Sequence, residues 1–197
     1  MSFPDRSFVI TFDDGYQTVY DDAFPVLQRY GMTATVFLTV GEKGAAKSGN
    51  RLPPQEGCSM LSWHEIREMQ RCDMDFGAHT LTHPNLTRLS SELVETEICS
   101  SKMIIEDALS ARVFSFAYPF GLYDHRSLEI VRENFTCACS DKMGLITLNS
   151  NLHILKRVDA YYLRTDRLFN IMLTRLFPWY VRICNMKRGI RRAFQRN

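Results

Sequence analysis

Two acidic residues stand where an apolar strand would end, and together they could bind a cation. Asp13 and Asp14 directly follow an apolar run over residues 8–12. Adjacent carboxylates repel each other, and a buried carboxylate is costly without a partner, so a bound cation would resolve both problems. The alternative is that the two acids only cap the following turn, because Asp favours turns.

Two histidines, His79 and His83, provide the other ligand type that such a cation needs. Their spacing places both imidazoles on one face of a helix, or allows a two-histidine clamp in a turn. The same spacing also occurs in purely structural histidines, so alone it carries little weight. Two imidazoles and one carboxylate form a ligand set suited to Zn²⁺ or a similar ion, with positions left for water and substrate. Thr80 and Thr82 could orient these groups through hydrogen bonds.

The elements that must position these residues follow an α/β pattern. Short apolar runs alternate with amphipathic segments of helical length, as in proteins with parallel strands. We expect strands at residues 8–12, 34–40, 75–79, 113–118, 136–140 and 154–158. We expect helices at residues 21–30, 62–72, 90–109 and 124–134, with Ser62 and Asp124 as caps of the second and the fourth.

This pattern puts the segments that carry candidate site residues in strand-to-helix loops, at residues 13–15, 79–83 and 119–124. In a closed parallel barrel all such loops emerge on one rim, where active sites collect. A long loop over residues 41–60, rich in Gly, Pro and Lys, is expected near the same site. The sequence therefore predicts that distant residues converge at one end of a sheet.

Three ordered motifs resemble the polysaccharide deacetylase family, also known as the NodB-homology domain or carbohydrate esterase family four. Residues 11–15 (TFDDG) and 77–83 (GAHTLTH) resemble its first two motifs, and residues 116–121 (FAYPFG) resemble the third. Residues 23–37 are similar to the connecting helix and second strand of the family, and the similarity covers roughly residues 7–160. The resemblance implies a distorted (β/α) barrel with fewer than eight repeats, which we place at residues 1–163.

The resemblance also implies a set of site residues. Asp14, His79 and His83 would bind a divalent metal, which we expect to be Zn²⁺ with Co²⁺ or Ni²⁺ as alternatives, and Asp13 would be the general base. A divalent ion lowers the pKa of its bound water to about 7, and a neighbouring carboxylate can accept the proton of that water. By analogy with the third motif, the backbone N–H of Phe120 would stabilise the oxyanion.

The activity implied is the removal of N-acetyl groups from an amino-sugar glycan or a lipid-linked glycan precursor, with acetate and a free amine as products. Two other functions stay open. One is the hydrolysis of a different amide or a cyclic imide, because a fold does not fix the substrate. The other is a non-catalytic carbohydrate-binding protein with an idle site.

The sequence departs from the family at two catalytic positions. Ala117 stands where many members carry an Arg that steadies the base, and Arg157, in a late segment over residues 155–159, could supply that charge from another strand. The acid that protonates the leaving amine is usually a histidine in a late motif. Here His153 and His125 are equal candidates, and metal-bound water or the protonated base is a third source.

The end of the chain has a different character from the rest. The net charge is only +2, yet all 22 acidic residues lie at or before Asp166, and residues 167–197 carry eight Arg or Lys. Apolar and cationic residues alternate there, which predicts a basic amphipathic helical tail over residues 164–197, broken into two helices by Pro178.

Such a tail can lie on an anionic membrane surface as a peripheral contact. The alternative is that its first half packs on the barrel while the second half is solvated. Nucleic-acid binding fits worse, because no recognised module accompanies the charge.

The cysteine pattern and the first residues indicate a compartment. Six cysteines form no CxxC pair, the start of the chain has no apolar signal core, and no apolar run has the length of a membrane span. We therefore expect a cytoplasmic protein, free or peripheral on the inner membrane surface, with unpaired and mostly buried cysteines.

Overall fold

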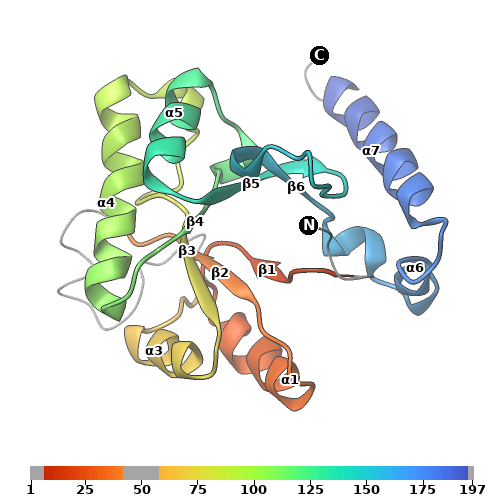
Figure 1. The fold of residues 1–197 in the computed structure, drawn as a ribbon, viewed down its shortest axis with the longest axis horizontal. Coiled ribbons are helices and arrows are strands. Elements are labelled where there is room, and N and C mark those ends of the chain that lie inside the picture. The colour runs from red at the N-terminus through yellow and green to blue at the C-terminus, as the bar shows by residue number, and fades with distance from the viewer. Residues whose placement is uncertain (1–6, 42–57, 195–197) are drawn as a thin grey trace.

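A parallel sheet of six strands forms the centre of the molecule (Figure 1). The computed structural model describes residues 7–41 and 58–194, so the expected loop at 41–60 lies almost wholly outside the described residues. The strands are β1 (Thr11–Phe12), β2 (Thr35–Leu38), β3 (Asp75–Ala78), β4 (Ser115–Ala117), β5 (Cys137–Met143) and β6 (Leu155–Arg157).

Each strand pairs in parallel with the next one along the chain, in the order β1-β2-β3-β4-β5-β6. The sheet curls into a half-barrel, which confirms the expected α/β fold of the distorted (β/α) barrel type. Because all strands run the same way, the segments that follow their carboxyl ends meet at one rim.

Helices α1 and α3 cover one side of the curled sheet and α4 and α5 cover the other, while α6 and α7 lie toward the C-terminal end of the molecule (Figure 1). They are α1 (Phe24–Arg29), α3 (Trp63–Arg71), α4 (Ser91–Leu109), α5 (His125–Asn134), α6 (Asp166–Ile171) and α7 (Phe177–Phe194). Shorter turns of helix span Val19–Ala23, Leu86–Arg88, Pro119–Gly121, Leu152–Ile154 and Ala160–Leu163.

Strand side chains alternate between two packed layers, as a pleated strand requires. In β2, Val36 and Leu38 belong to the main core beneath the helices, while Phe37 between them joins a small inner cluster with Ala117 and Cys139. The inner cluster therefore lies on the concave side of the half-barrel.

Local capping interactions explain why α3 and α5 begin where the sequence predicted. The Ser62 hydroxyl accepts a hydrogen bond from the Glu65 N–H, and the Glu65 carboxylate accepts one from the Ser62 N–H, which is the expected capping box. Asp124 accepts a hydrogen bond from the N–H of Ser127 at 3.0 Å. Both caps satisfy backbone donors that a helix start would otherwise leave unpaired.

The first helix differs from the expected helix over residues 21–30. A wide turn over Val19–Ala23 precedes a shorter α1, which has Pro25 in its first turn. Proline has no N–H to donate, so the regular i to i−4 ladder cannot run through this point.

The predicted break at Pro178 is wrong. Helix α7 starts at Phe177 and keeps Pro178 in its first turn, where the missing N–H would have no intrahelical partner. The chain instead breaks over residues 172–176, between α6 and α7. The boundary between barrel and tail at residue 164 stays a prediction.

The cysteines form no disulfide, as expected. Cys139 and Cys184 are buried, but Cys58 and Cys72 are exposed, so the expectation of mostly buried thiols is wrong. In the described ranges, no helix combines the length and the apolar character that crossing a membrane requires.

Candidate metal centre

Asp14, His79 and His83 converge at the carboxyl ends of the strands. The Nε2 atoms of His79 and His83 each lie 3.6 Å from Oδ1 of Asp14. One potential ligand atom from each residue lies within 4.8 Å of the others. Asp14 and two histidines that lie 65 and 69 positions later in the sequence therefore present their donor atoms to one point.

The Asp14 carboxylate tests whether these residues fit a cation. Its Oδ1 atom is buried and has no hydrogen-bond partner among the residues that the structure describes. A buried, unpaired carboxylate oxygen is costly, and a cation between it and the two imidazoles would remove that cost. One carboxylate and two imidazoles are also the donor set that leaves a catalytic divalent ion open positions. The residues therefore fit a divalent metal.

The ring of His79 is held in the orientation that a ligand needs. Its Nδ1 lies 2.6 Å from the carbonyl oxygen of Ala117. A carbonyl can only accept, so Nδ1 carries the proton and Nε2 turns its lone pair toward Asp14. Burial lowers the pKa of His79 despite the opposing charge of Asp13, which favours the neutral imidazole that binds metals.

The turn that carries both histidines is not a helix. Thr80 and His83 adopt left-handed backbone conformations, and the Thr80 hydroxyl accepts a hydrogen bond from the His83 N–H at 3.1 Å. The expected orienting role of Thr80 thus acts on the backbone of His83. Of the two geometries that the spacing allowed, the structure shows the clamp in a turn.

Strained backbone gathers at this site. Of the six non-glycine residues with positive φ in the described part of the chain, four lie here, at Asp14 (72°), Thr80 (69°), His83 (56°) and Phe120 (57°). Such conformations cost about 1–3 kcal/mol each and persist where the surroundings impose them, typically at functional sites.

Glu97 of α4 fixes the same turn, and no sequence pattern singled it out. Its carboxylate accepts hydrogen bonds from the backbone N–H groups of Leu81 and Thr82 at 2.8 and 3.0 Å. It also accepts one from the Thr82 hydroxyl at 2.7 Å. A single side chain from the helix therefore holds the middle of the loop between the two histidines.

Asp13 faces Arg157 rather than the two histidines' nitrogen atoms. Arg157 donates from Nη1 to Oδ1 at 2.6 Å and from Nη2 to Oδ2 at 2.8 Å, a two-pronged ion pair. Burial would raise the pKa of Asp13, but the hydrogen bond and charge of Arg157, with the charges of His79 and His83, hold it below its ordinary value. Asp13 is therefore ionised near neutral pH.

Arg157 also joins the two open edges of the sheet. It belongs to β6, and besides Asp13 it donates to the hydroxyl of Thr11 in β1 at 3.3 Å. Its Nε donates to the carbonyl of Ser140 at 3.2 Å, which fixes the guanidinium plane. Side chains at the site thus connect β1 and β6, the two edge strands, which do not pair with each other through backbone hydrogen bonds.

The structure does not bring His153 or His125 to this cluster. His153 precedes β6, and its Nε2 lies 3.0 Å from the carbonyl of Phe135, which precedes β5, so it belongs to the opposite end of the sheet. The His125 side chain is 82% exposed at the start of α5 and lies 3.2 Å from Glu129.

Phe120, by contrast, lies at the site. Its ring centroid is 4.6 Å from that of His83, and the residue is 56% exposed. Its neighbour Tyr118 is almost fully buried in the main core. Phe120 is therefore the aromatic residue of the third motif that can meet a ligand above the histidines.

Comparison with known proteins adds to this geometry. The sequence model of the family described as "Polysaccharide deacetylase" matches residues 1–135. A poly-beta-1,6-N-acetyl-D-glucosamine N-deacetylase of Staphylococcus aureus is 28% identical over 169 residues, which are 79% of this chain and 55% of that protein. The chain thus spans about half the length of this curated relative.

Two solved structures share the fold. A Streptococcus pyogenes deacetylase in complex with acetate aligns with a TM-score of 0.67 and 28% identity, over 76% of this chain and 62% of that one. A Bacillus cereus polysaccharide deacetylase aligns with a TM-score of 0.69 and 27% identity, over 84% of this chain and 51% of that one. With the matched family model covering more than half of its residues, this chain belongs to the polysaccharide deacetylase family.

Proposed function

We propose that this protein is a metal-dependent hydrolase that removes N-acetyl groups from an amino-sugar glycan or a lipid-linked glycan precursor. The observation that carries the proposal is the cluster of Asp14, His79 and His83, with the ionised Asp13 next to it. The substrate class is suggested by relatives, one of which is named an N-deacetylase of an N-acetylglucosamine polymer.

Asp14, His79 and His83 would hold the cation, for which Zn²⁺ is our first choice and Co²⁺ or Ni²⁺ are alternatives. A bound divalent ion would polarise the amide carbonyl and make water a nucleophile at neutral pH. Asp13 would accept the proton of that water, and Arg157 would keep the carboxylate ionised and oriented.

The remaining catalytic tasks fall to two groups. We assign to the backbone N–H of Phe120 a role in stabilising the oxyanion that forms on the acetyl carbonyl. The leaving amine needs a proton, and His153 and His125 are not placed at the cluster. We therefore assign the return of the proton to Asp13, which holds it after the attack by water.

The test is acetate release from N-acetylglucosamine oligomers. We expect acetate in proportion to enzyme, loss of activity with a chelator, and recovery with Zn²⁺, Co²⁺ or Ni²⁺. Turnover of other amides or a cyclic imide, with no release of acetate from sugars, would favour the alternative hydrolase. Glycan binding by the metal-loaded protein without any turnover would favour the non-catalytic protein.

A further inference from the structure

Helix α7 carries two apolar stripes, and only one of them is packed. The inner stripe contains Val181 and Cys184, which are buried against Met143 of β5. The second stripe contains Trp179, Ile183 and Met186, which are 64%, 48% and 66% exposed. Their spacing of four and three residues puts them on one face of the helix. A helix that already has its core contact thus leaves a second apolar face uncovered.

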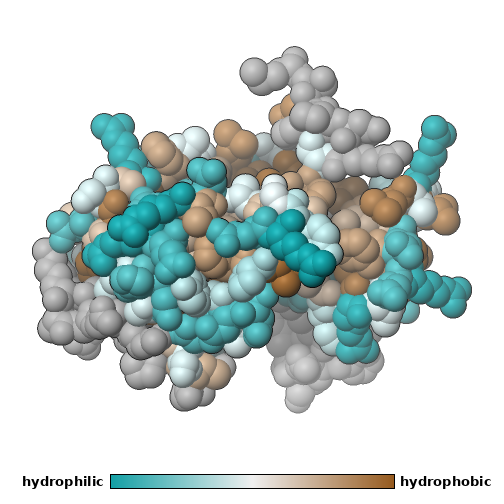
Figure 2. Space-filling view, turned by 90° about the horizontal axis from the view of Figure 1, so that it is seen from below, coloured by the Kyte–Doolittle hydropathy of each residue, from teal (hydrophilic) through white to brown (hydrophobic). Residues whose placement is uncertain are grey.

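Three more exposed apolar residues precede this stripe in the chain. Leu176, Leu173 and Phe169, in the connection to α6 and in α6 itself, are each at least half exposed. Figure 2 shows apolar residues among polar ones at the end of the molecule where Figure 1 places α6 and α7. Single apolar residues are ordinary on a protein surface, but six exposed ones spaced three or four residues apart over residues 169–186 indicate an interaction surface.

Basic residues flank this stripe, and no acidic residue lies between residues 167 and 197. Four of them are exposed, namely Arg167, Arg175, Arg182 and Lys187. Arg188 differs, since it donates to the Asp141 carboxylate at 2.8 Å and ties α7 to β5. The positive charge near the apolar stripe is therefore not neutralised by acids of the same segment.

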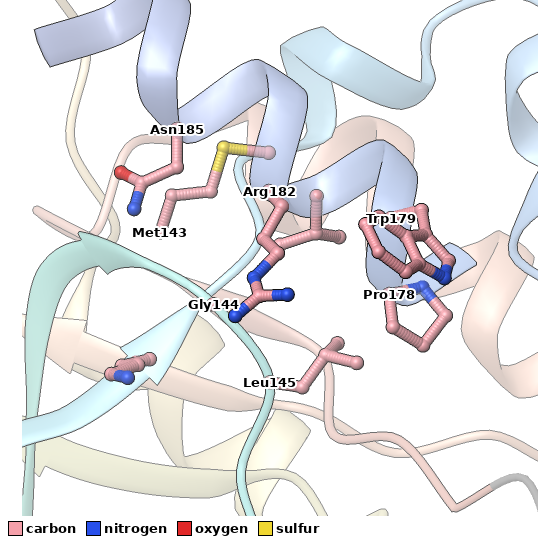
Figure 3. Close-up of a pocket in the computed structure, with 9 residues that line it drawn as sticks. Met143, Gly144, Leu145, Pro178, Trp179, Arg182 and Asn185 are labelled. Atoms are coloured by element: carbon pink, nitrogen blue, oxygen red, sulfur yellow. The ribbon is translucent and has the colours of Figure 1, made fainter. Parts of the chain in front are cut away.

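A pocket of about 470 Å³ adjoins the stripe, between α7 and the end of β5 (Figure 3). Its lining combines Trp179 and Arg182 of α7 with Lys156 of β6. The guanidinium carbon of Arg182 lies 5.7 Å from the Trp179 ring, and Figure 3 shows the Arg182 side chain extending from the helix toward Gly144. One cation beside an indole ring, with a second cation lining the same pocket, can take an anionic headgroup at an apolar boundary.

We propose that the surface formed by α6 and α7 docks this protein onto a bilayer that contains anionic phospholipids. Trp179, Ile183 and Met186 would enter the boundary between headgroups and acyl chains, where Trp is favoured. Arg182 and Lys156 would meet the headgroup phosphates. A nucleic acid would use the charge but leave the apolar stripe uncovered, and a second copy of the same face would set two basic segments against each other. The proposal does not depend on the metal centre.

Flotation of the 197-residue chain with vesicles tests the proposal. Phosphatidylcholine vesicles, with and without phosphatidylglycerol, would be compared at low and high salt. We expect strong flotation only with the anionic vesicles, and loss of it at high salt because salt screens the attraction. Equal flotation with both vesicle types, or with neither, would overturn the proposal.

Apolar variants locate the contact on α7. Trp179→Ser with Ile183→Ser should lower the vesicle partition coefficient by more than tenfold, because both side chains leave the bilayer boundary. The matched control is Val26→Ser with Met32→Ser, two exposed apolar residues at and just beyond α1. Unchanged circular dichroism would show that each variant is folded. A loss shared equally by the control would contradict the assignment to α7.

Charge variants make an independent test. Arg182→Gln with Lys187→Gln should lower partitioning by about 25-fold, since each basic residue near an anionic surface contributes about fivefold. The control, Arg29→Gln with Arg71→Gln, removes two exposed cations at α1 and α3 and should bind like the parent protein. A chain that dimerises through this face, with dimers lost in the Trp179 variant and no vesicle binding, would replace the bilayer by a second copy.

Discussion

Asp13 and Asp14 are neighbours in the chain, yet their surroundings give them different chemistry. Asp14 turns a buried, unpaired oxygen toward two imidazoles, while both oxygens of Asp13 are held by Arg157. The left-handed backbone of Asp14 accompanies this divergence of the two side chains. One carboxylate is therefore suited to a cation, and the other is suited to accept a proton beside it.

Replacing either acid by its amide should separate the two roles. We expect Asp14→Asn to weaken zinc binding at least 100-fold. The loss of an outer contact of a metal site already lowers metal affinity by up to about 100-fold, and Asp14 would bind the metal directly. Asp13→Asn should keep the metal and lower kcat by about 100-fold or more, because it removes the base. Isothermal titration with Zn²⁺ and acetate release measure the two effects. Equal metal loss in both variants would contradict the division of roles.

Arg157 should act on turnover rather than on metal binding. Arg157→Ala leaves Asp13 without its partner, so we expect kcat to fall by about 100-fold while zinc affinity stays near that of the parent. Arg126→Ala is a matched control, because it removes an arginine that pairs with Asp124 at 2.7 Å on α5. An unchanged rate in Arg157→Ala would dismiss the role.

At the level of elements, the contact between α4 and the histidine turn holds the site together. Glu97 accepts three hydrogen bonds from Leu81 and Thr82, between the two histidines. Without it the turn would lose its fixed shape, and the imidazoles would no longer be set in advance for a cation.

Glu97→Ala should therefore weaken zinc binding by about 10–100-fold, the usual effect of removing an outer contact of a metal site. Glu95→Ala, two residues earlier on the exposed side of α4, is the control and should bind zinc normally. Competition with a chromogenic chelator measures both affinities. Identical affinities for the two variants would show that the turn keeps its shape without Glu97.

The cap of α5 gives a prediction on stability and pH. Burial would raise the pKa of Asp124, but the N–H of Ser127 and the guanidinium of Arg126 lower it. Its stabilising effect is therefore present at neutral pH and is lost as pH falls through the lowered pKa. Asp124→Ala should cost about 1 kcal/mol of unfolding free energy at neutral pH, and this difference should shrink in acid. Urea unfolding at several pH values measures it, and a difference that grows in acid would contradict the assignment.

Elements could be predicted from sequence wherever their signals are local. The caps at Ser62 and Asp124, and the acids and histidines after apolar strands, depend on neighbouring residues and appear where expected. Glu97 could not be predicted, because its contact depends on how α4 sits on the sheet. The break predicted at Pro178 was wrong because a proline breaks the interior of a helix but suits its first turn. The sequence did not show that α7 begins one residue before Pro178.

At the scale of the whole molecule, the contact that bridges the two open edges of the half-barrel also belongs to the candidate site. Strands β1 and β6 are both edges of the sheet, and Arg157 bridges them through Thr11 and Asp13. Arg157 of β6 pairs with Asp13, and its replacement of the Arg expected at the position of Ala117 stays a prediction. The structure has helices at Asp166–Ile171 and Phe177–Phe194, but the division into barrel and tail and the cytoplasmic location stay predictions.

The most direct test of the account is anomalous X-ray scattering at the zinc absorption edge, measured on crystals of the zinc-loaded protein. The account predicts one strong peak among Oδ1 of Asp14 and Nε2 of His79 and His83. The carboxylate of Asp13 should remain on Arg157. Crystals soaked in zinc that show no peak at these three atoms, or show it only at surface residues, would contradict it.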